Sequence, residues 1–127
     1  MFDWRRPTNL GVKDGRLARC RRSPNCVSSQ ADPADKEHYI APIAFSGTMD
    51  QLRRAIAELP LATIVEAKDD YLYAEFRTPI LRFVDDVEFL KLDDVLHIRS
   101  ASRLGRRDFK ANRNRVEQLR ALIRSIR

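Results

Sequence analysis

Residues 62–76, "ATIVEAKDDYLYAEF", read as two β-strands joined by a two-residue turn at Asp69 and Asp70. Both runs are rich in apolar, β-branched or aromatic residues, and aspartate is one of the residues that favour turns. Odd-numbered residues of the first strand then share a mostly apolar face with even-numbered residues of the second. The register that follows from this turn pairs Lys68 with Tyr71, Ala67 with Leu72, Val65 with Ala74 and Thr63 with Phe76.

Residues 84–102, "VDDVEFLKLDDVLHIRSAS", repeat the pattern around a second turn at Asp93 and Asp94. Opposite charges lie directly across from each other in the resulting register, which stabilises neighbouring strands. Two successive hairpins, linked through "RTPIL" at 77–81, predict a four-stranded antiparallel meander. The second register pairs Leu92 with Val95, Leu90 with His97, Glu88 with Arg99 and Asp86 with Ala101.

A strand and a helix are predicted before the first hairpin. Residues 38–45, "HYIAPIAF", read as a short strand, and Pro42 favours an edge position because proline cannot donate to the sheet. Residues 48–59 predict a helix, since Thr48 and Gln51 have capping-box spacing ahead of a helical apolar repeat.

The final segment, residues 108–127, also places its apolar residues at helical spacing, and Asp108 or Asn112 can cap its start. The order strand, helix, four-stranded meander, helix predicts an α+β fold. We expect an antiparallel meander sheet of four to five strands with two helices packed on one face. Residues 1–37, interrupted by proline and glycine, predict an irregular N-terminal segment that packs on the single domain formed by residues 38–127.

The formal net charge of +6 is unevenly distributed along the 127 residues. Residues 1–30 carry seven Lys and Arg against two Asp and Glu, and residues 101–127 carry nine against two, whereas residues 31–100 carry eight against fourteen. Basic ends that flank an acidic centre can pair within the chain, so the charge is weak evidence for nucleic acid. Nucleic-acid binding ranks last because no recognised motif or aromatic stacking platform accompanies the charge.

No apolar run approaches the roughly 20 residues that cross a bilayer, so we expect no membrane span. Residues 1–11, "MFDWRRPTNLG", lack the apolar core of a signal peptide, and we therefore expect a cytoplasmic protein. Nothing in the sequence indicates an oligomeric state.

Strand alternation sends Asp85 to the apolar face, whereas Asp86 and Glu88 point the other way. In the predicted register Asp85 lies opposite Ser102 and one diagonal step from Ser100, and these serines can supply the hydrogen bonds that a carboxylate on an apolar face needs. We interpret Asp85 as a structural anchor rather than a general base.

On the opposite face, Asp86 and Glu88 meet Arg99 and lie near Arg103. We expect a solvent-exposed cluster of ion pairs there, each contributing about 0.2–1 kcal/mol.

Arginines are concentrated in residues 102–115, "SRLGRRDFKANRNR", where the last strand meets the last helix. A helix N-terminus with nearby arginines suits a phosphate or carboxylate. Equally, Asp108 can occupy that N-terminus while the arginines pair with the acidic centre, and both interpretations stay open.

Two cysteines lie six positions apart in residues 20–30, "CRRSPNCVSSQ". Four roles are open to these cysteines: a nucleophile, half of a metal site, a disulfide loop, or two reduced, half-buried thiols. A reducing cytoplasm favours the last. Two cysteines and two distant histidines give no recognised zinc spacing, so we expect no metal and no cofactor. Neither a phosphate-binding loop, a dinucleotide glycine pattern nor a nucleophile elbow is present.

Seven segments, taken in order, resemble the bacterial and plastid family known as domain of unknown function 1499: "PTNLG", "DGRLARC", "SPNCVSSQ", "IAPIAF", "FVDDVEF", "IRSASRLGRRDF" and "NRNRVEQLR". The resemblance runs from about Pro7 to about Ile123 and implies no particular reaction, ligand or cofactor. It marks Cys20, Ser23, Pro24, Asn25, Cys26, Ser28, Ser29, Asp85, Asp86, Glu88, Arg99, Ser100, Ser102, Arg103, Gly105, Asp108, Asn112, Arg113 and Arg115.

Two departures from the family pattern are visible. Relatives commonly read "CPDSPNC" where this chain has Arg21 and Arg22, and they commonly have glycine where this chain has Lys110. Lys110 argues against a close backbone approach of a ligand at the start of the last helix. Many relatives also look exported or membrane-attached, which this chain does not.

We expect a non-enzymatic binding module in which the "SPNCVSS" segment and residues 99–115 form a pocket for a small anionic ligand or a partner carboxylate. The candidate binding residues are the marked set without Cys20, Pro24 and Gly105. The alternative is a thiol-dependent enzyme or redox protein, with Cys26 as the reactive thiol and Cys20 as its resolving partner. We favour binding because no catalytic motif is recognisable.

Overall fold

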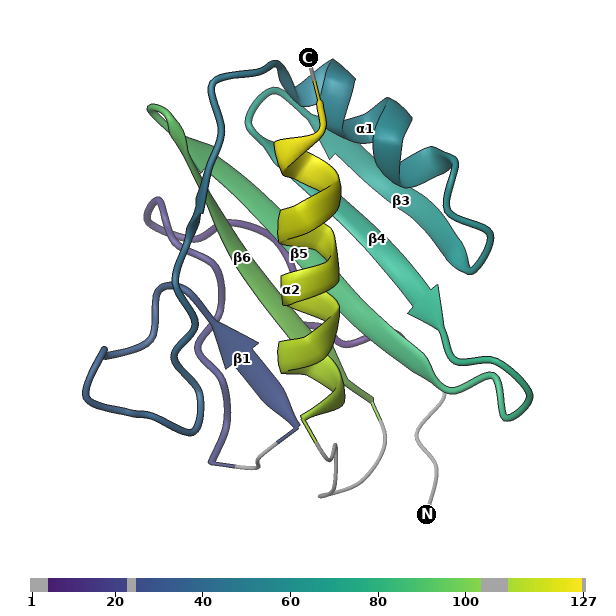
Figure 1. Ribbon diagram of the computed structural model, residues 1–127. Helices are drawn as coiled ribbons and strands as arrows, with labels where there is room; N and C mark the ends of the chain where they lie inside the picture. The colour runs from purple at the N-terminus through teal and green to yellow at the C-terminus, as the bar shows by residue number, and fades with distance from the viewer. Residues whose placement is uncertain (1–4, 23–24, 104–109, 127) are drawn as a thin grey trace.

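The computed structural model describes residues 5–22, 25–103 and 110–126, which form one antiparallel sheet with two helices on one face (Figure 1). The strands are β1 (Cys26–Ser28), β2 (Ile43–Ala44), β3 (Ala62–Lys68), β4 (Tyr71–Arg77), β5 (Val84–Leu92) and β6 (Val95–Ser102), and the helices are α1 (Met49–Ala57) and α2 (Ala111–Arg124). The strand order is β1-β6-β5-β4-β3, and β2 pairs with the same outer edge of β6 as β1. The predicted α+β fold is confirmed.

The capping box of α1 is confirmed. The Thr48 hydroxyl accepts from the Gln51 backbone N–H at 3.1 Å, and the Gln51 side chain accepts from the Thr48 N–H at 2.8 Å. Leu52 and Ile56 are buried on the face that meets the sheet.

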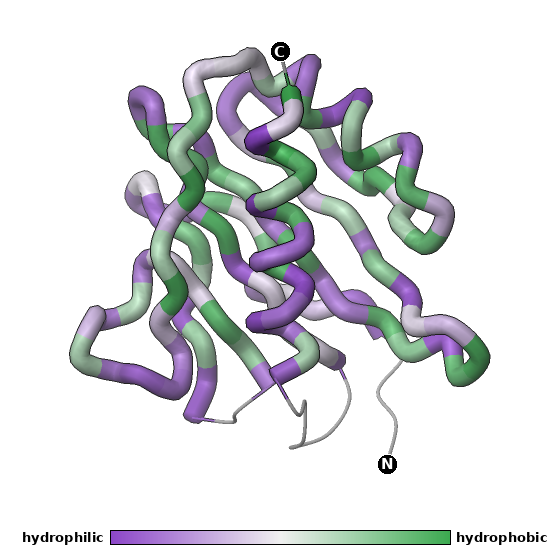
Figure 2. Tube along the Cα trace, viewed as in Figure 1, coloured by the Kyte–Doolittle hydropathy of each residue, from purple (hydrophilic) through white to green (hydrophobic). Residues whose placement is uncertain are grey.

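Helix α2 begins differently from the prediction. Its N-cap is Lys110, in the left-handed conformation with φ 67° and no side-chain cap, whereas Asn112 lies inside the helix and is fully buried. The prediction that Asn112 caps the helix is therefore wrong. The other predicted cap, Asp108, lies outside the described residues. Hydrophobic and hydrophilic residues alternate along α2 (Figure 2), and its apolar residues join the main core. No helix in the described part of the chain has the length and apolar character needed to cross a membrane.

The two hairpin registers differ in outcome. All four predicted pairs of β5 with β6 are confirmed, as is Asp85 opposite Ser102. Between β3 and β4 the two pairs nearest the turn are confirmed, but an irregularity between Ile64 and Glu66 shifts the rest by one residue. Ala62 and Ile64 therefore pack on the helix face. Bulges of this kind favour edge strands such as β3.

The N-terminal part of the chain covers the other face of the sheet, which we call the back face (Figure 1). Leu17 and Leu10 pack there against Tyr71, Tyr73 and Leu90. The strand β1, which was not predicted, forms within residues 1–37, and β2 is much shorter than the predicted strand over 38–45. Both faces of the central strands are therefore buried.

Candidate functional site

The structure distributes the candidate residues over both faces of the sheet rather than gathering them into one site. Ser23 and Asp108 lie outside the described residues. The helix face carries Asp85, Ser100, Ser102, Asn112, Arg113 and Arg115; the back face carries Asp86, Glu88, Arg99 and Arg103; and the edge strand with its flanks carries Asn25, Cys26, Ser28 and Ser29.

On the helix face, Asp85 forms an ion pair with Arg115 of α2, whose guanidinium lies 5.3 Å from the centre of the Phe76 ring. Ser100 and Ser102, which were expected to bond to Asp85, bond instead to Asn112 of α2. The carboxylate anchors the helix, because a buried charge requires a partner and Arg115 supplies one.

Asn112 joins α2 to β6 and to the residue that precedes β1. It accepts from the Ser100 hydroxyl at 2.7 Å, and its amide group donates to the Ser102 hydroxyl at 2.8 Å and to the Asn25 carbonyl at 3.0 Å. Arg113 points elsewhere and donates to exposed backbone carbonyls of residues 36 and 37. These contacts hold elements together, because each named group bonds to another part of the chain.

Of the two serines at the end of the edge strand, Ser29 bonds to β6 and Ser28 bonds within its own segment. The Ser29 hydroxyl accepts from the Ile98 N–H at 2.9 Å and lies 2.9 Å from Nδ1 of His97, while the Ser28 hydroxyl accepts from the Gln30 N–H at 3.1 Å. Burial, together with the nearby Arg16 charge, lowers the pKa of His97. A neutral His97 ring at pH 7 follows.

Cys20 and Cys26 are joined in a disulfide, which contradicts the alternative of two reduced thiols. Neither sulfur is a thiolate in this state, and a thiolate is what nucleophilic chemistry needs. The bond closes a loop that carries Arg21 and Asn25.

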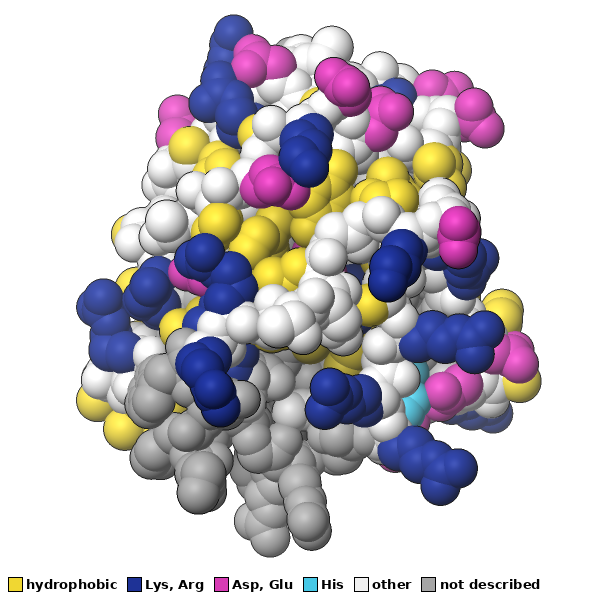
Figure 3. Space-filling model, turned by 180° about the vertical axis from the view of Figure 1, so that it is seen from behind, with side chains coloured by type: hydrophobic (Ala, Val, Ile, Leu, Met, Phe, Trp, Pro, Cys, Tyr) yellow, Lys and Arg dark blue, Asp and Glu magenta, His cyan; other side chains and the backbone are white. Residues whose placement is uncertain are grey.

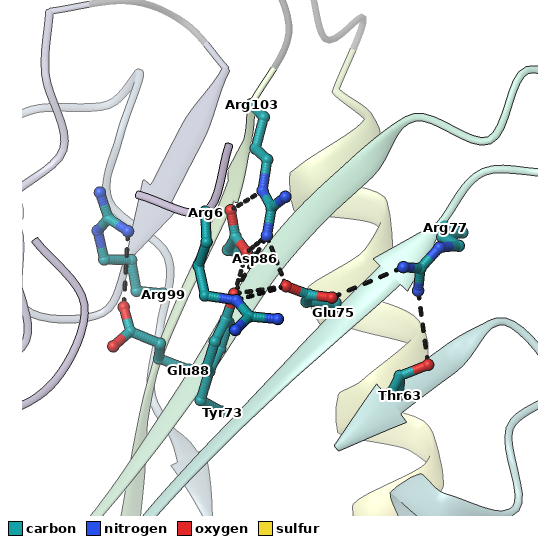
Figure 4. Close-up of polar contacts among 9 residues, drawn as sticks. All are labelled: Arg6, Thr63, Tyr73, Glu75, Arg77, Asp86, Glu88, Arg99 and Arg103. Atoms are coloured by element: carbon teal, nitrogen blue, oxygen red, sulfur yellow. Dashed lines mark hydrogen bonds and ion pairs between the residues drawn. The ribbon is translucent and has the colours of Figure 1, made fainter. Parts of the chain in front are cut away.

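The back face holds a buried cluster of charges (Figure 4). Arg103 bonds to both oxygens of Asp86, at 2.9 and 3.0 Å, and to Glu75 at 2.6 Å. Their side chains are 8%, 2% and 6% exposed, so the expected solvent-exposed cluster is wrong. The N-terminal segment covers this face, and its Arg6 also bonds to Glu75 at 2.9 Å. Burial raises the pKa of Glu75, but hydrogen bonds from Arg6 and Arg103 outweigh it and leave that pKa lowered.

Beside this cluster, Glu88 and Arg99 form a less complete pair (Figure 4). Glu88 Oε2 accepts from the Tyr71 hydroxyl at 2.5 Å and from the Gly11 N–H at 2.8 Å. Arg99 Nη1 lies 3.6 Å from Glu88 Oε1, and neither Oε1 nor Arg99 Nε has a hydrogen-bond partner among the described residues. Burial raises the pKa of Glu88 and lowers that of Arg99. The pair therefore bears a desolvation cost that its own contacts offset only in part.

A cavity of about 550 Å³ opens over these groups. It lies between the N-terminal segment, the disulfide loop and the ends of β5 and β6, and lysine and arginine side chains gather over the lower half of this face (Figure 3). We call it the arginine pocket, because five arginines and a single carboxylate, Asp86, are among its described lining residues. The lining consists of Arg5, Arg6, Pro7, Thr8, Asn9, Arg21, Asn25, Cys26, Asp86, Arg99, Ala101, Ser102 and Arg103.

A second cavity of about 570 Å³ lies beside Cys20. Arg16 and Arg19 line it together with Asp32 and Asp35, so its charges are balanced. His38 in its wall is bonded to Asp35 at 2.8 Å. In the part of the chain that the structure describes, no group of three or more His, Cys, Asp or Glu side chains could hold a metal ion.

Several residues of the arginine pocket and of the buried charge cluster beside it were not among the candidates. Arg5 and Arg6 come from the segment predicted to be irregular, where no periodicity indicates which face a side chain meets. Tyr73 and Glu75 were detectable in part, because alternation places them on one face of their strand. Their positions opposite Glu88 and Asp86 depend on the register of β4 with β5, which a loop longer than a tight turn does not specify.

Comparison with known proteins identifies a family. No curated protein and no solved structure matches the chain. A family model described as "Protein of unknown function (DUF1499)" matches residues 16–123, which is most of the chain and includes Cys20, the central hairpins and all of α2 except its last residue. The chain therefore belongs to the DUF1499 family.

Proposed function

We propose that this chain is a non-enzymatic binding protein whose arginine pocket takes a small anionic ligand or a carboxylate of a partner. The observation that carries the proposal is the lining of a 550 Å³ cavity by five arginines, one of which, Arg99, is 5% exposed. Cavities of this size are typical of small-molecule sites.

The energetics of Arg99 support an anion. A buried guanidinium is costly unless charges and hydrogen-bond acceptors surround it, and Glu88 approaches it only to 3.6 Å. An oxyanion in the pocket supplies acceptors next to Arg99 and lowers that cost. Charge-assisted hydrogen bonds to guanidinium are stronger than neutral ones, so the same contacts favour binding.

Thermal-shift measurements and isothermal titration calorimetry with inorganic phosphate and with malonate test the proposal. We expect binding to the wild-type protein and a loss of at least about tenfold in affinity for Arg103→Ala, since truncating a buried charged contact costs about 2–5 kcal/mol. Arg6→Ala serves as a second variant, because Arg6 is 53% exposed and its loss is compatible with folding.

Arg113→Ala is the matched control, since Arg113 lies outside the arginine pocket and bonds to backbone carbonyls on the helix face. We expect its affinity to equal that of the wild type. Absence of binding to the wild-type protein, or equal losses for Arg6→Ala and Arg113→Ala, would overturn the proposal.

The disulfide bears on the expected cytoplasmic location, because such bonds persist mainly in oxidising compartments. We infer that the protein acts where Cys20 and Cys26 stay oxidised. Trapping of thiols in intact cells with an alkylating reagent tests this. We expect both cysteines to stay unmodified. Complete alkylation without prior reduction would contradict the inference and support a cytoplasmic location.

A further inference from the structure

The loop between β4 and β5 carries the two most exposed large apolar side chains of the described part of the chain. It consists of residues 78–83, "TPILRF", and Ile80 and Leu81 at its tip are 94% and 64% exposed. The loop projects beyond the end of the sheet (Figure 1), and its tip is hydrophobic (Figure 2). Single exposed apolar residues are ordinary, but two adjacent ones on a projecting tip indicate a surface that meets another apolar body.

The backbone holds this tip away from the rest of the chain. At the base of the loop the Thr78 N–H donates to the Phe83 carbonyl at 2.8 Å, and the Thr78 hydroxyl accepts from the Phe83 N–H at 2.9 Å. Ile80 has a φ of 67°, and a β-branched residue seldom adopts this left-handed conformation. Such strain is common at functional sites. The loop thus displays Ile80 at a conformational cost that its almost fully exposed side chain does not offset by packing.

Arginines flank the apolar tip and extend over the same end of the sheet. Arg82 is exposed within the loop, and Arg77 at the base of the loop is half-buried. Arg21 and Arg22 are exposed in the disulfide loop, which precedes β1 at this end. The positive charges therefore come from segments on both sides of the central strands.

The carboxylates of this end are buried, whereas exposed carboxylates lie at the opposite end. Glu75, Asp85 and Asp86 have side chains at most 6% exposed, and each is bonded to an arginine. The hairpin turns at the other end, residues 69–70 and 93–94, consist of exposed aspartates. Figure 3 shows acidic side chains along the upper edge and mostly basic ones over the lower half. A negatively charged surface therefore attracts the end that carries the apolar tip and repels the other.

We infer that this end of the protein docks on a lipid bilayer that contains anionic lipids, with Ile80 and Leu81 inserted at the level of the acyl chains. Arginines near a bilayer are attracted to anionic headgroups, and apolar side chains gain free energy on leaving water. Charges spread across the width of the sheet suit an extended negative surface better than the single pocket of a protein partner. The inference goes beyond the proposed function and does not depend on the arginine pocket.

Co-sedimentation of the full chain with vesicles tests the inference. Vesicles of phosphatidylcholine and phosphatidylglycerol in equal parts are compared with vesicles of phosphatidylcholine alone. We expect the wild type to bind the anionic vesicles at least about tenfold more tightly, and added salt to weaken that binding. Arg82→Gln should weaken it about fivefold, since it removes one charge beside the tip.

The double variant Ile80→Asn with Leu81→Gln removes the apolar tip. Asparagine tolerates the left-handed conformation better than isoleucine, so we expect a urea midpoint no lower than that of the wild type. Its affinity for anionic vesicles should fall at least about tenfold. Leu92→Gln is the matched control, because Leu92 is a 40% exposed leucine at the opposite end of the sheet, and we expect wild-type affinity for it.

Three outcomes would overturn the inference. They are equal binding by the double variant and Leu92→Gln, equal binding of the wild type to both kinds of vesicle, and no binding to either kind, which would favour a protein partner for the tip. Each of them leaves the proposed function intact, because that function is tested with soluble anions.

Discussion

Removal of the Arg103 side chain should destabilise the protein strongly, because it leaves two buried carboxylates without their shared cation. Asp86 and Glu75 are 2% and 6% exposed, and Arg103 bonds to both. Breaking a buried ion pair by removing one partner costs about 3–5 kcal/mol. Arg6 remains bonded to Glu75 and Tyr73 to Asp86, so we expect the lower end, about 3 kcal/mol, for Arg103→Ala.

Urea unfolding followed by circular dichroism measures this loss, and Arg113→Ala is again the control, with an expected loss below about 1 kcal/mol. The difference between wild type and Arg103→Ala should also depend on pH. The pKa of Glu75 is lowered in the folded chain. The ionised Glu75 therefore contributes its full stabilisation above the ordinary carboxyl pKa of 4.5, and this stabilisation is lost as the pH falls through the lower pKa of the folded state. A loss for Arg103→Ala no larger than that for Arg113→Ala, or one that grows as the pH falls, would refute the reasoning.

Three further predictions concern other parts of the structure. Asn112→Ala should lower the free energy of unfolding by about 2–3 kcal/mol in chemical denaturation, because it leaves buried serine and backbone groups unpaired, whereas the exposed Asn114→Ala should change it by less than about 0.5 kcal/mol. Glu88→Gln should become more stable relative to the wild type as the pH rises above about 4.5. The pKa of Glu88 is raised in the folded chain, so the wild type loses stability as the pH rises from the ordinary value to the raised one. A difference in unfolding free energy between the two proteins that stays constant with pH would contradict this assignment. Reduction of the Cys20–Cys26 bond should cost about 2 kcal/mol of unfolding free energy, as expected for a short closed loop, and an unchanged urea midpoint after reduction would exclude a stabilising role.

Helix α1, the apolar repeat of α2 and the second hairpin could be predicted because their signals are local. Thr48 and Gln51 specify the start of α1, and the turn after Leu92 places Glu88 opposite Arg99 by counting alone. The register of β3 with β4 could not be predicted beyond Val65. An extra residue in an exposed edge strand does not change the apolar pattern from which the register was counted.

The burial of the charged cluster could not be predicted, because it depends on a segment without periodicity. The sequence indicates that Asp86 and Glu88 share a face, but not that residues 5–17 cover it. The ion pair of Asp85 with Arg115 could not be predicted from the sequence for a related reason. Residues 30 positions apart meet only because α2 docks across the sheet, and no local pattern specifies where a helix docks.

The most direct test of the arginine pocket is a titration of ¹⁵N-labelled protein with inorganic phosphate, in which the Nε–Hε signals of individual arginines are followed by NMR. Saturable shifts at Arg99 and Arg21 are predicted, because Arg99 has only the 3.6 Å contact with Glu88 and Arg21 lines the same pocket. Arg113 and Arg115 on the helix face should stay unchanged. Shifts confined to the helix-face arginines, or none at any arginine, would contradict the account.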